Sequence, residues 1–206
     1  MVRSLGDARR WTLQGTRLFT TAIEGLTESS YDAPTLLPDW NRRQLVAHVA
    51  ANAEALGNLV LWATTGVETP MYRSAKERAA GIARGLTMGG DDLESWLLPS
   101  AQQLELAMDA LAEDRWTAVV VTAQGRSVPA SETAWMRARV CVHAVDLDLG
   151  VALSSLDAGF LTALTDDVVA KRGAVPPVDG PLDQHVASLT GRPHALPDVT
   201  TLPAWL

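Results

Sequence analysis

Two histidines each lie among apolar residues in a segment with helical spacing. His48 is in the run Leu45-Val46-Ala47-His48-Val49-Ala50, and His143 is in Val140-Cys141-Val142-His143-Ala144-Val145-Asp146. A buried imidazole needs a hydrogen-bond partner, because burying an unpaired polar group costs free energy. Neutral imidazole is also the commonest nitrogen ligand of zinc, and helical bundles build metal sites from side chains of separate helices. Each histidine is therefore a core residue bonded to a neighbour or a metal ligand, and the presence of two favours one shared site.

A zinc site of this kind needs a third protein ligand, because catalytic zinc takes about three protein ligands and keeps one position open. The best local candidate is Asp146, three residues after His143 and near the same helix face. Arg139, four residues before His143, would repel a cation. Glu132 lies eleven residues before His143, roughly 16 Å along a helix at 1.5 Å per residue, which is too far. The third ligand is thus left open between Asp146 and water.

Amphipathic helices are expected to position these residues. Apolar side chains recur at three- and four-residue steps, with capping residues and glycines at the ends of the segments. The helices are predicted at residues 4–26, 39–66, 74–86, 91–112 and 131–150. A short β-branched segment and a Gln-Gly-Arg turn predict a small hairpin within residues 116–128. The fold class is therefore mainly α: a four-helix bundle with a hairpin insertion over residues 1–150.

The composition changes after Gly150. One helical pattern covers residues 158–171, a Gly/Pro-rich strip covers 173–181, and a short helix is expected at 184–190. We expect residues 151–206 to form a second, small unit.

Composition excludes several classes of function. The chain has 206 residues, of which 47% are hydrophobic and 20% charged, as is typical of a folded globular protein. A net charge of −7 without a basic stripe argues against nucleic acid as a partner. With Cys141 as the single cysteine, no intrachain disulfide can form. No apolar run is long enough to span a bilayer or to form a signal peptide, so we expect a cytoplasmic protein without a membrane partner.

Several segments, in the same order along the chain, resemble the mycothiol-dependent maleylpyruvate isomerases. They are Leu37-Pro38-Asp39-Trp40, Leu45 to Ala53, Thr65 to Tyr72, Thr122 to Thr133, Trp135-Met136-Arg137, His143 to Leu147, Gly191-Arg192 and Trp205-Leu206. The resemblance implies a DinB-like four-helix bundle followed by a small α+β C-terminal domain. It also implies an isomerase that uses mycothiol as cosubstrate and turns maleylpyruvate into fumarylpyruvate. The chemistry is conjugate addition of a thiolate, rotation about the resulting single bond, and elimination.

The resemblance also assigns roles to single residues. It implies that His48 and His143 are two ligands of a divalent metal, expected to be zinc, and that Arg192 serves the active site as a catalytic residue. The family's third ligand, a glutamate four residues before the second histidine, has no counterpart here, because Arg139 is followed directly by Val140. The difference corresponds to the loss of one residue, which would turn the rest of a helix by about 100°.

Other residues near these positions have more than one interpretation. Asn52, one helical turn after His48, and Arg126, in the expected hairpin, are predicted to contact mycothiol, although Arg126 could equally hold a substrate carboxylate or lie at the surface. Cys141, between two valines, is expected to be a small buried hydrophobe rather than a nucleophile. Three outcomes stay open: a metal site completed by Asp146 or water, a thiol site without metal, and a binding protein without turnover. A transferase that joins mycothiol to another electrophile is the alternative enzyme.

Overall fold

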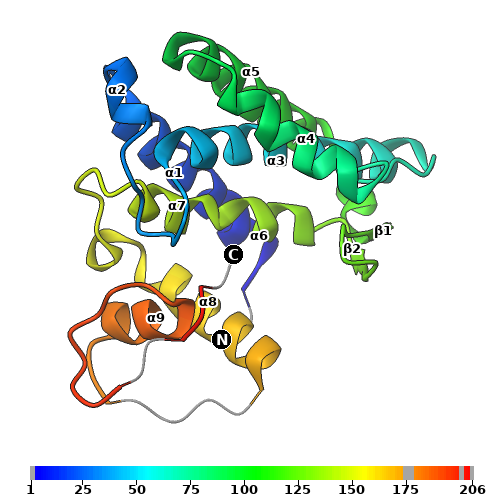
Figure 1. Cartoon of the computed structure of the whole chain (residues 1–206). Coiled ribbons are helices and arrows are strands. Elements are labelled where there is room, and N and C mark those ends of the chain that lie inside the picture. The colour runs from blue at the N-terminus through cyan, green and yellow to red at the C-terminus, as the bar shows by residue number, and fades with distance from the viewer. Residues whose placement is uncertain (1–2, 174–178, 200–201, 205–206) are drawn as a thin grey trace.

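The computed structural model describes residues 3–173, 179–199 and 202–204, and within these ranges the protein is mainly helical with one small antiparallel sheet (Figure 1). The longer helices are α1 (Leu5–Ile23), α3 (Arg42–Thr65), α4 (Ala75–Leu86), α5 (Gly90–Ala110) and α8 (Ala158–Arg172). The shorter ones are α2 (Glu28–Tyr31), α6 (Glu132–Ala138), α7 (Val140–Asp146) and α9 (Leu182–Thr190), with 3₁₀ turns η1 (Glu113–Thr117) and η2 (Leu153–Ser155). The sheet pairs β1 (Val119–Val121) with β2 (Ser127–Pro129).

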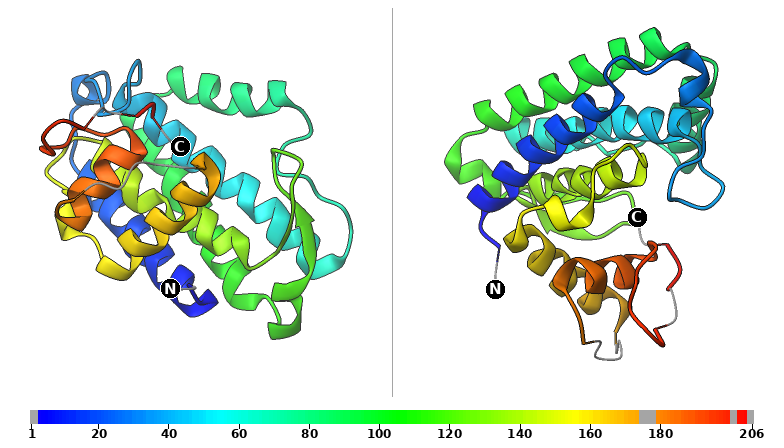
Figure 2. Two further views of the ribbon diagram at one scale, coloured as in Figure 1. Left: turned by 90° about the horizontal axis from the view of Figure 1, so that it is seen from below. Right: turned by 90° about the vertical axis from the view of Figure 1, so that its left-hand side faces the viewer.

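The helices lie in layers. α3 packs against α5 and α4, and α1 packs against α6 and α7. Helices α8 and α9 contact each other and lie beyond α6 and α7, on the side away from α4 and α5 (Figures 1 and 2). The predicted hairpin is confirmed, with Val120 opposite Val128.

The sequence at both ends of α3 explains why this long helix begins and ends where it does. The Asn41 side chain accepts a hydrogen bond from the Gln44 backbone N–H, and the Gln44 side chain accepts one from the Asn41 N–H. At the other end Gly66 adopts a left-handed conformation with φ 73°. Among the described helices, α3 alone has a length and composition compatible with crossing a membrane, but 56% of that window is buried inside the protein. It is the central helix of the core.

Three aromatic rings join α1, α6 and α8 in the core. The centroid of the Trp11 ring is 6.0 Å from that of Trp135 and 5.8 Å from that of Phe160, and Trp135 and Phe160 are 5.8 Å apart. The Trp11 indole N–H also donates to Asp157 Oδ1, 3.1 Å away, and the same carboxylate caps α8 by accepting from the Phe160 N–H. Residues 158–172 therefore pack directly on the preceding helices.

Replacing Asp157 with alanine is expected to lower the free energy of unfolding by about 1–2 kcal/mol, because it removes a helix cap and the partner of the Trp11 indole. Asp157→Asn keeps an oxygen acceptor at the cap and should stay close to the wild type. Urea denaturation followed by tryptophan fluorescence measures both variants. Equal loss in the alanine and asparagine variants would contradict this account.

Two predicted elements differ from the structure. The expected continuous helix over residues 131–150 is interrupted at Arg139, where α6 ends and α7 begins, and α7 ends at Asp146. The chain then turns through Asp148 and Gly150, both with positive φ. The expected β structure after residue 150 is not found among the described residues there. Residues 192–196 run without a strand partner, and one of their backbone groups, the Ala195 N–H, donates to the Gln184 side chain.

Candidate functional site

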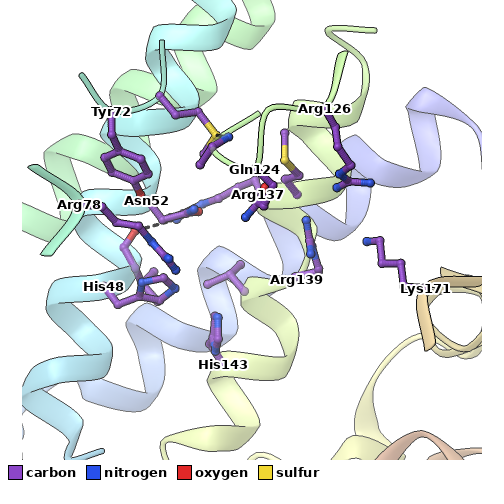
Figure 3. Close-up of a pocket in the computed structure, with 15 residues that line it drawn as sticks. His48, Asn52, Tyr72, Arg78, Gln124, Arg126, Arg137, Arg139, His143 and Lys171 are labelled. Carbon is purple, nitrogen blue, oxygen red and sulfur yellow. Dashed lines mark hydrogen bonds between the residues drawn. The ribbon is translucent and has the colours of Figure 1, made fainter. Parts of the chain in front are cut away.

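A cavity of about 480 Å³ lies between α3, the segment leading into α4, the hairpin turn, the α6–α7 pair and α8 (Figure 3). Its lining residues are His48, Val49, Asn52, Met71, Tyr72, Arg78, Ala123, Gln124, Arg126, Met136, Arg137, Arg139, Val140, His143 and Lys171. The cavity thus brings together residues from distant parts of the chain, including His48, Asn52, Arg126 and His143, which the sequence singles out.

The two histidines are neighbours at one end of this cavity. Their ring centroids are 5.4 Å apart and the rings are nearly perpendicular, at 88°. The Trp40 ring contacts the His48 imidazole edge-on, at 5.6 Å between centroids. Burial is the main cause that lowers the pKa of His48 to about 3, and the nearby Arg78 and Arg137 guanidinium groups lower it further. His48 is therefore a neutral imidazole at pH 7.

His143 is held by the buried Asp146–Arg192 ion pair. Its Nδ1 lies 3.0 Å from Asp146 Oδ2, and Arg192 donates from Nε to Oδ1 at 2.9 Å and from Nη2 to Oδ2 at 2.7 Å. Asp146 is fully buried and Arg192 is only 1% exposed. Burial raises the pKa of Asp146, but the hydrogen bonds from His143 and Arg192 outweigh it and lower that pKa below its usual value. With Nδ1 engaged by Asp146, Nε2 is the His143 nitrogen left for the cavity.

Arg192 and Asp146 are therefore placed behind the cavity wall and not on its surface. Arg192 is predicted from the sequence to serve the active site, and in the structure it reaches that site through Asp146 and His143. Asp146, the predicted substitute ligand, does not line the cavity, since both its oxygens accept hydrogen bonds from Arg192. The ion pair joins Asp146 of α7 to Arg192, which lies 46 residues further along the chain, and so holds the C-terminal part of the chain against α7.

The rest of the lining is strongly cationic. Within the described ranges, no aspartate or glutamate lines the cavity. Its five basic side chains are Arg78, Arg126, Arg137, Arg139 and Lys171. They form two groups. Arg78 and Arg137 act electrostatically on His48, whereas Arg126 and Arg139 act on Lys171, whose pKa is lowered chiefly by burial. An acidic protein, with a net charge of −7, thus encloses a positive cavity suited to a small anion.

Arg137 is the most deeply buried of these cations. It is 2% exposed, and burial lowers its pKa to about 10. Its Nη1 donates to the Val49 carbonyl at 2.8 Å (Figure 3), while Nη2 has no hydrogen-bond partner within the described protein. A buried donor left without a partner is costly, and because Arg137 lines the cavity, its positive charge favours an anion bound there.

The donor set does not fit a zinc ion with three protein ligands. His48 and His143 supply two neutral nitrogens, but among the described residues no cluster of three His, Cys, Asp or Glu side chains is suited to hold a metal. Arg139 stands four residues before His143, where the resemblance implies a glutamate, and it lines the same cavity. Its guanidinium and that of Arg137 would repel a divalent cation.

Cys141 lies outside the cavity lining, as expected for a small buried hydrophobe. Its Sγ donates to the Trp11 carbonyl at 3.3 Å, and burial raises the pKa of the thiol to about 12. At neutral pH it is a protonated thiol in the core, against α1. The sulfur nucleophile must therefore come from a second molecule.

Comparison with known proteins agrees with this geometry. Residues 12–148 match the family model described as the mycothiol maleylpyruvate isomerase N-terminal domain. The chain belongs to this family. No match was found among curated proteins.

Two solved structures resemble this member of the mycothiol maleylpyruvate isomerase family over almost its whole length. One is a crystal structure of the mycothiol-dependent maleylpyruvate isomerase, and the other is a histidine-to-alanine mutant of that enzyme. Each is 32% identical in sequence, covers 98% of both chains and has a TM-score of 0.90.

Arg78, Gln124 and Lys171 line the cavity of this family member although the sequence analysis assigns them no role in the site. Gln124 lies in the Thr122 to Thr133 segment that resembles the family, and this is the only signal for it. Lys171 comes from α8, at the end of an ordinary helical pattern, and nothing in the local sequence indicates that it reaches the cavity.

Proposed function

We propose that this protein is a mycothiol-dependent isomerase that converts maleylpyruvate into fumarylpyruvate. The observation that carries the proposal is the cavity in which two adjacent imidazoles face a wall of guanidinium groups. Such a cavity suits a thiolate and a dicarboxylate, because both reactants are anions and both are bound at the moment of reaction.

The proposed reaction uses the positive charge in two ways, to hold the substrate carboxylates and to stabilise the enolate. Guanidinium groups hold the substrate carboxylates, and Arg126 with Lys171 forms one cationic end of the cavity. The thiolate of mycothiol adds to the double bond, and the π electrons move to the conjugated carbonyl oxygen as an enolate. The new single bond rotates, and elimination of the thiolate restores a double bond in the trans form. The cationic wall stabilises the enolate, which carries more charge on oxygen than the substrate ketone does.

Arg192 and Asp146 act in this proposal as positioning residues. Through Asp146, Arg192 fixes the orientation of His143 and leaves Nε2 as the imidazole nitrogen available to the cavity. Asn52 and Arg126 contact mycothiol, with the amide serving its hydroxyl groups and the guanidinium its carbonyl oxygens.

Incubation of the purified protein with maleylpyruvate and mycothiol tests the function. Proton NMR of the product should show the trans alkene, and a reaction without mycothiol should show none. A stable thioether in place of the trans product would identify a mycothiol S-transferase. Recovery of unchanged substrate and thiol would contradict both activities and leave a small-molecule-binding protein.

The predicted mycothiol contacts have a distinct kinetic signature. Asn52→Ala should raise the KM for mycothiol by up to about tenfold, and Arg126→Gln by about 10- to 100-fold, with kcat little changed. Arg115→Gln, an exposed arginine on η1 outside the cavity, is the matched control and should leave both constants unchanged. If Arg126→Gln raises the KM for maleylpyruvate alone, then Arg126 holds the substrate and not mycothiol.

The finer architecture and location form part of the same proposal. Helices α1, α3, α5 and the α6–α7 pair form a DinB-like four-helix bundle, and residues 151–206 form a second unit. The pairwise packing of these helices supports the first part. We place the protein in the cytoplasm, without a nucleic-acid or membrane partner, which the acidic composition and the single buried Cys141 support.

A further inference from the structure

We propose that this chain activates its thiol without a resident metal ion, and that Arg78 and Arg137, beside the two imidazoles, hold the sulfur as a thiolate. The inference rests on the proposed function and adds how the nucleophile of that reaction is held.

The first support is that three described side chains near His143 in the sequence, which could otherwise be considered as ligands, are engaged elsewhere. Both oxygens of Asp146 accept hydrogen bonds from Arg192, behind the cavity wall. Glu132 pairs with Arg3, 2.6 Å away. Cys141 donates to the Trp11 carbonyl in the core. Two imidazoles without a charged ligand provide a weak site for a divalent ion.

The second support is the sign of the charge around the imidazoles. Arg78 and Arg137 line the same cavity as His48 and His143, and the buried Arg137 Nη2 has no hydrogen-bond partner in the described protein. Positive charge at this place disfavours a metal ion. It favours an anion, and a thiolate is the anion that the proposed reaction requires.

The third support is the course of the chain at Arg139. Met136, Arg137, Val140 and His143 have the spacing of one helix face, and all four line the cavity on both sides of the boundary between α6 and α7. The cavity therefore keeps both its imidazoles and its cations in place despite the residue missing relative to the family pattern. Arg139, four residues before His143, also lines the cavity. It places a cation at the position where a metal site would need a carboxylate.

The thiol step balances without a metal. The S–H proton of mycothiol leaves to solvent, and the thiolate enters the cavity beside Arg78 and Arg137. The carbon–sulfur bond then forms while the carbon–carbon π bond breaks, and the electron pair goes to the enolate oxygen. Elimination reverses these changes and releases the thiolate unchanged, so no oxidant or reductant is consumed.

Metal dependence is the first test, on full-length protein purified without a metal-affinity tag. We expect substoichiometric zinc by elemental analysis, an unchanged kcat/KM after dialysis against a chelator, and no gain on adding zinc. A zinc-dependent enzyme would instead lose about 10²- to 10³-fold in kcat/KM on chelation. Stoichiometric zinc whose removal abolishes turnover and whose return restores it would overturn the inference.

Arg139→Glu is the second test, with zinc affinity measured by competition with a chromophoric chelator. The substitution removes a cation and places a carboxylate one turn before His143, so zinc binding should tighten by about 100-fold or more over the wild type. Arg126→Glu makes the same charge change at the other end of the cavity and should have a much smaller effect. Equal zinc affinity in wild type and Arg139→Glu would overturn the inference.

The two proposals fail in different ways. Absence of turnover in both metal-free and zinc-supplemented protein contradicts the isomerase function. The zinc affinities of the wild type and the two glutamate variants do not depend on turnover, and they decide the metal question alone.

Discussion

Replacing Asp146 with asparagine is expected to lower the free energy of unfolding by about 3–5 kcal/mol, because it leaves the buried Arg192 guanidinium without its counter-ion. It should also release His143 from its Nδ1 partner and so reduce turnover. Urea denaturation measures the first effect, and the isomerase assay measures the second.

Two further variants show whether the effect comes from this ion pair. Asp148→Asn changes an exposed carboxylate two residues away and should stay close to the wild type. Adding Arg192→Met to Asp146→Asn removes the unpaired charge and should recover about 1 kcal/mol or more. If the losses of unfolding free energy in the Asp146→Asn and Arg192→Met single variants simply add in the double variant, the pairing is contradicted.

The same carboxylate predicts a pH dependence. Because the pKa of Asp146 is lower in the folded protein than its usual value near 3.8, its ionisation stabilises the fold above that value. This contribution is lost as the pH falls through the lowered pKa. The stability difference between wild type and Asp146→Asn should therefore be largest above about pH 5 and shrink in stronger acid.

Replacing Arg137 with glutamine is expected to lower kcat/KM by about 10²- to 10³-fold, the loss typical of removing one buried donor to a developing charge. Arg137 lines the cavity at the place proposed for the thiolate, and among the described residues its buried Nη2 has no hydrogen-bond partner. Arg137→Lys keeps the charge but cannot form bidentate hydrogen bonds, so its kcat/KM should lie between those of the wild type and the glutamine variant.

Circular dichroism and thermal melting separate this effect from unfolding, since Arg137 also donates to the Val49 carbonyl. A glutamine variant that melts like the wild type and turns over at the wild-type rate would show that Arg137 has only a structural role.

Local sequence signals predicted the elements that depend on neighbouring residues. The capping box at Asn41 and the left-handed Gly66 bound α3 close to the expected limits, and the β-branched residues before the Gln-Gly-Arg turn form the expected hairpin. The proximity of His48 and His143 also follows, because each lies on the apolar face of a helix that packs in the same core.

Contacts that depend on tertiary packing could not be predicted from the sequence. The Asp146–Arg192 pair joins residues 46 positions apart, and either residue alone is an ordinary charged side chain. Lys171 reaches the cavity only because the Trp11, Trp135 and Phe160 rings dock α8 against α1 and α6. The missing residue near Arg139 is visible in the sequence, but the helix interruption that accommodates it depends on what packs around the helix.

The cavity wall includes a residue of α8 and is supported by a residue that follows α9, which couples ligand affinity to the stability of the C-terminal helices. Lys171 on α8 lines the cavity, and Arg192 just after α9 supports it through Asp146 and His143. By thermodynamic linkage, an anion that binds this cavity must protect α8 and α9 from local opening. Slower amide exchange in those two helices would then report occupancy of a site formed largely by other elements.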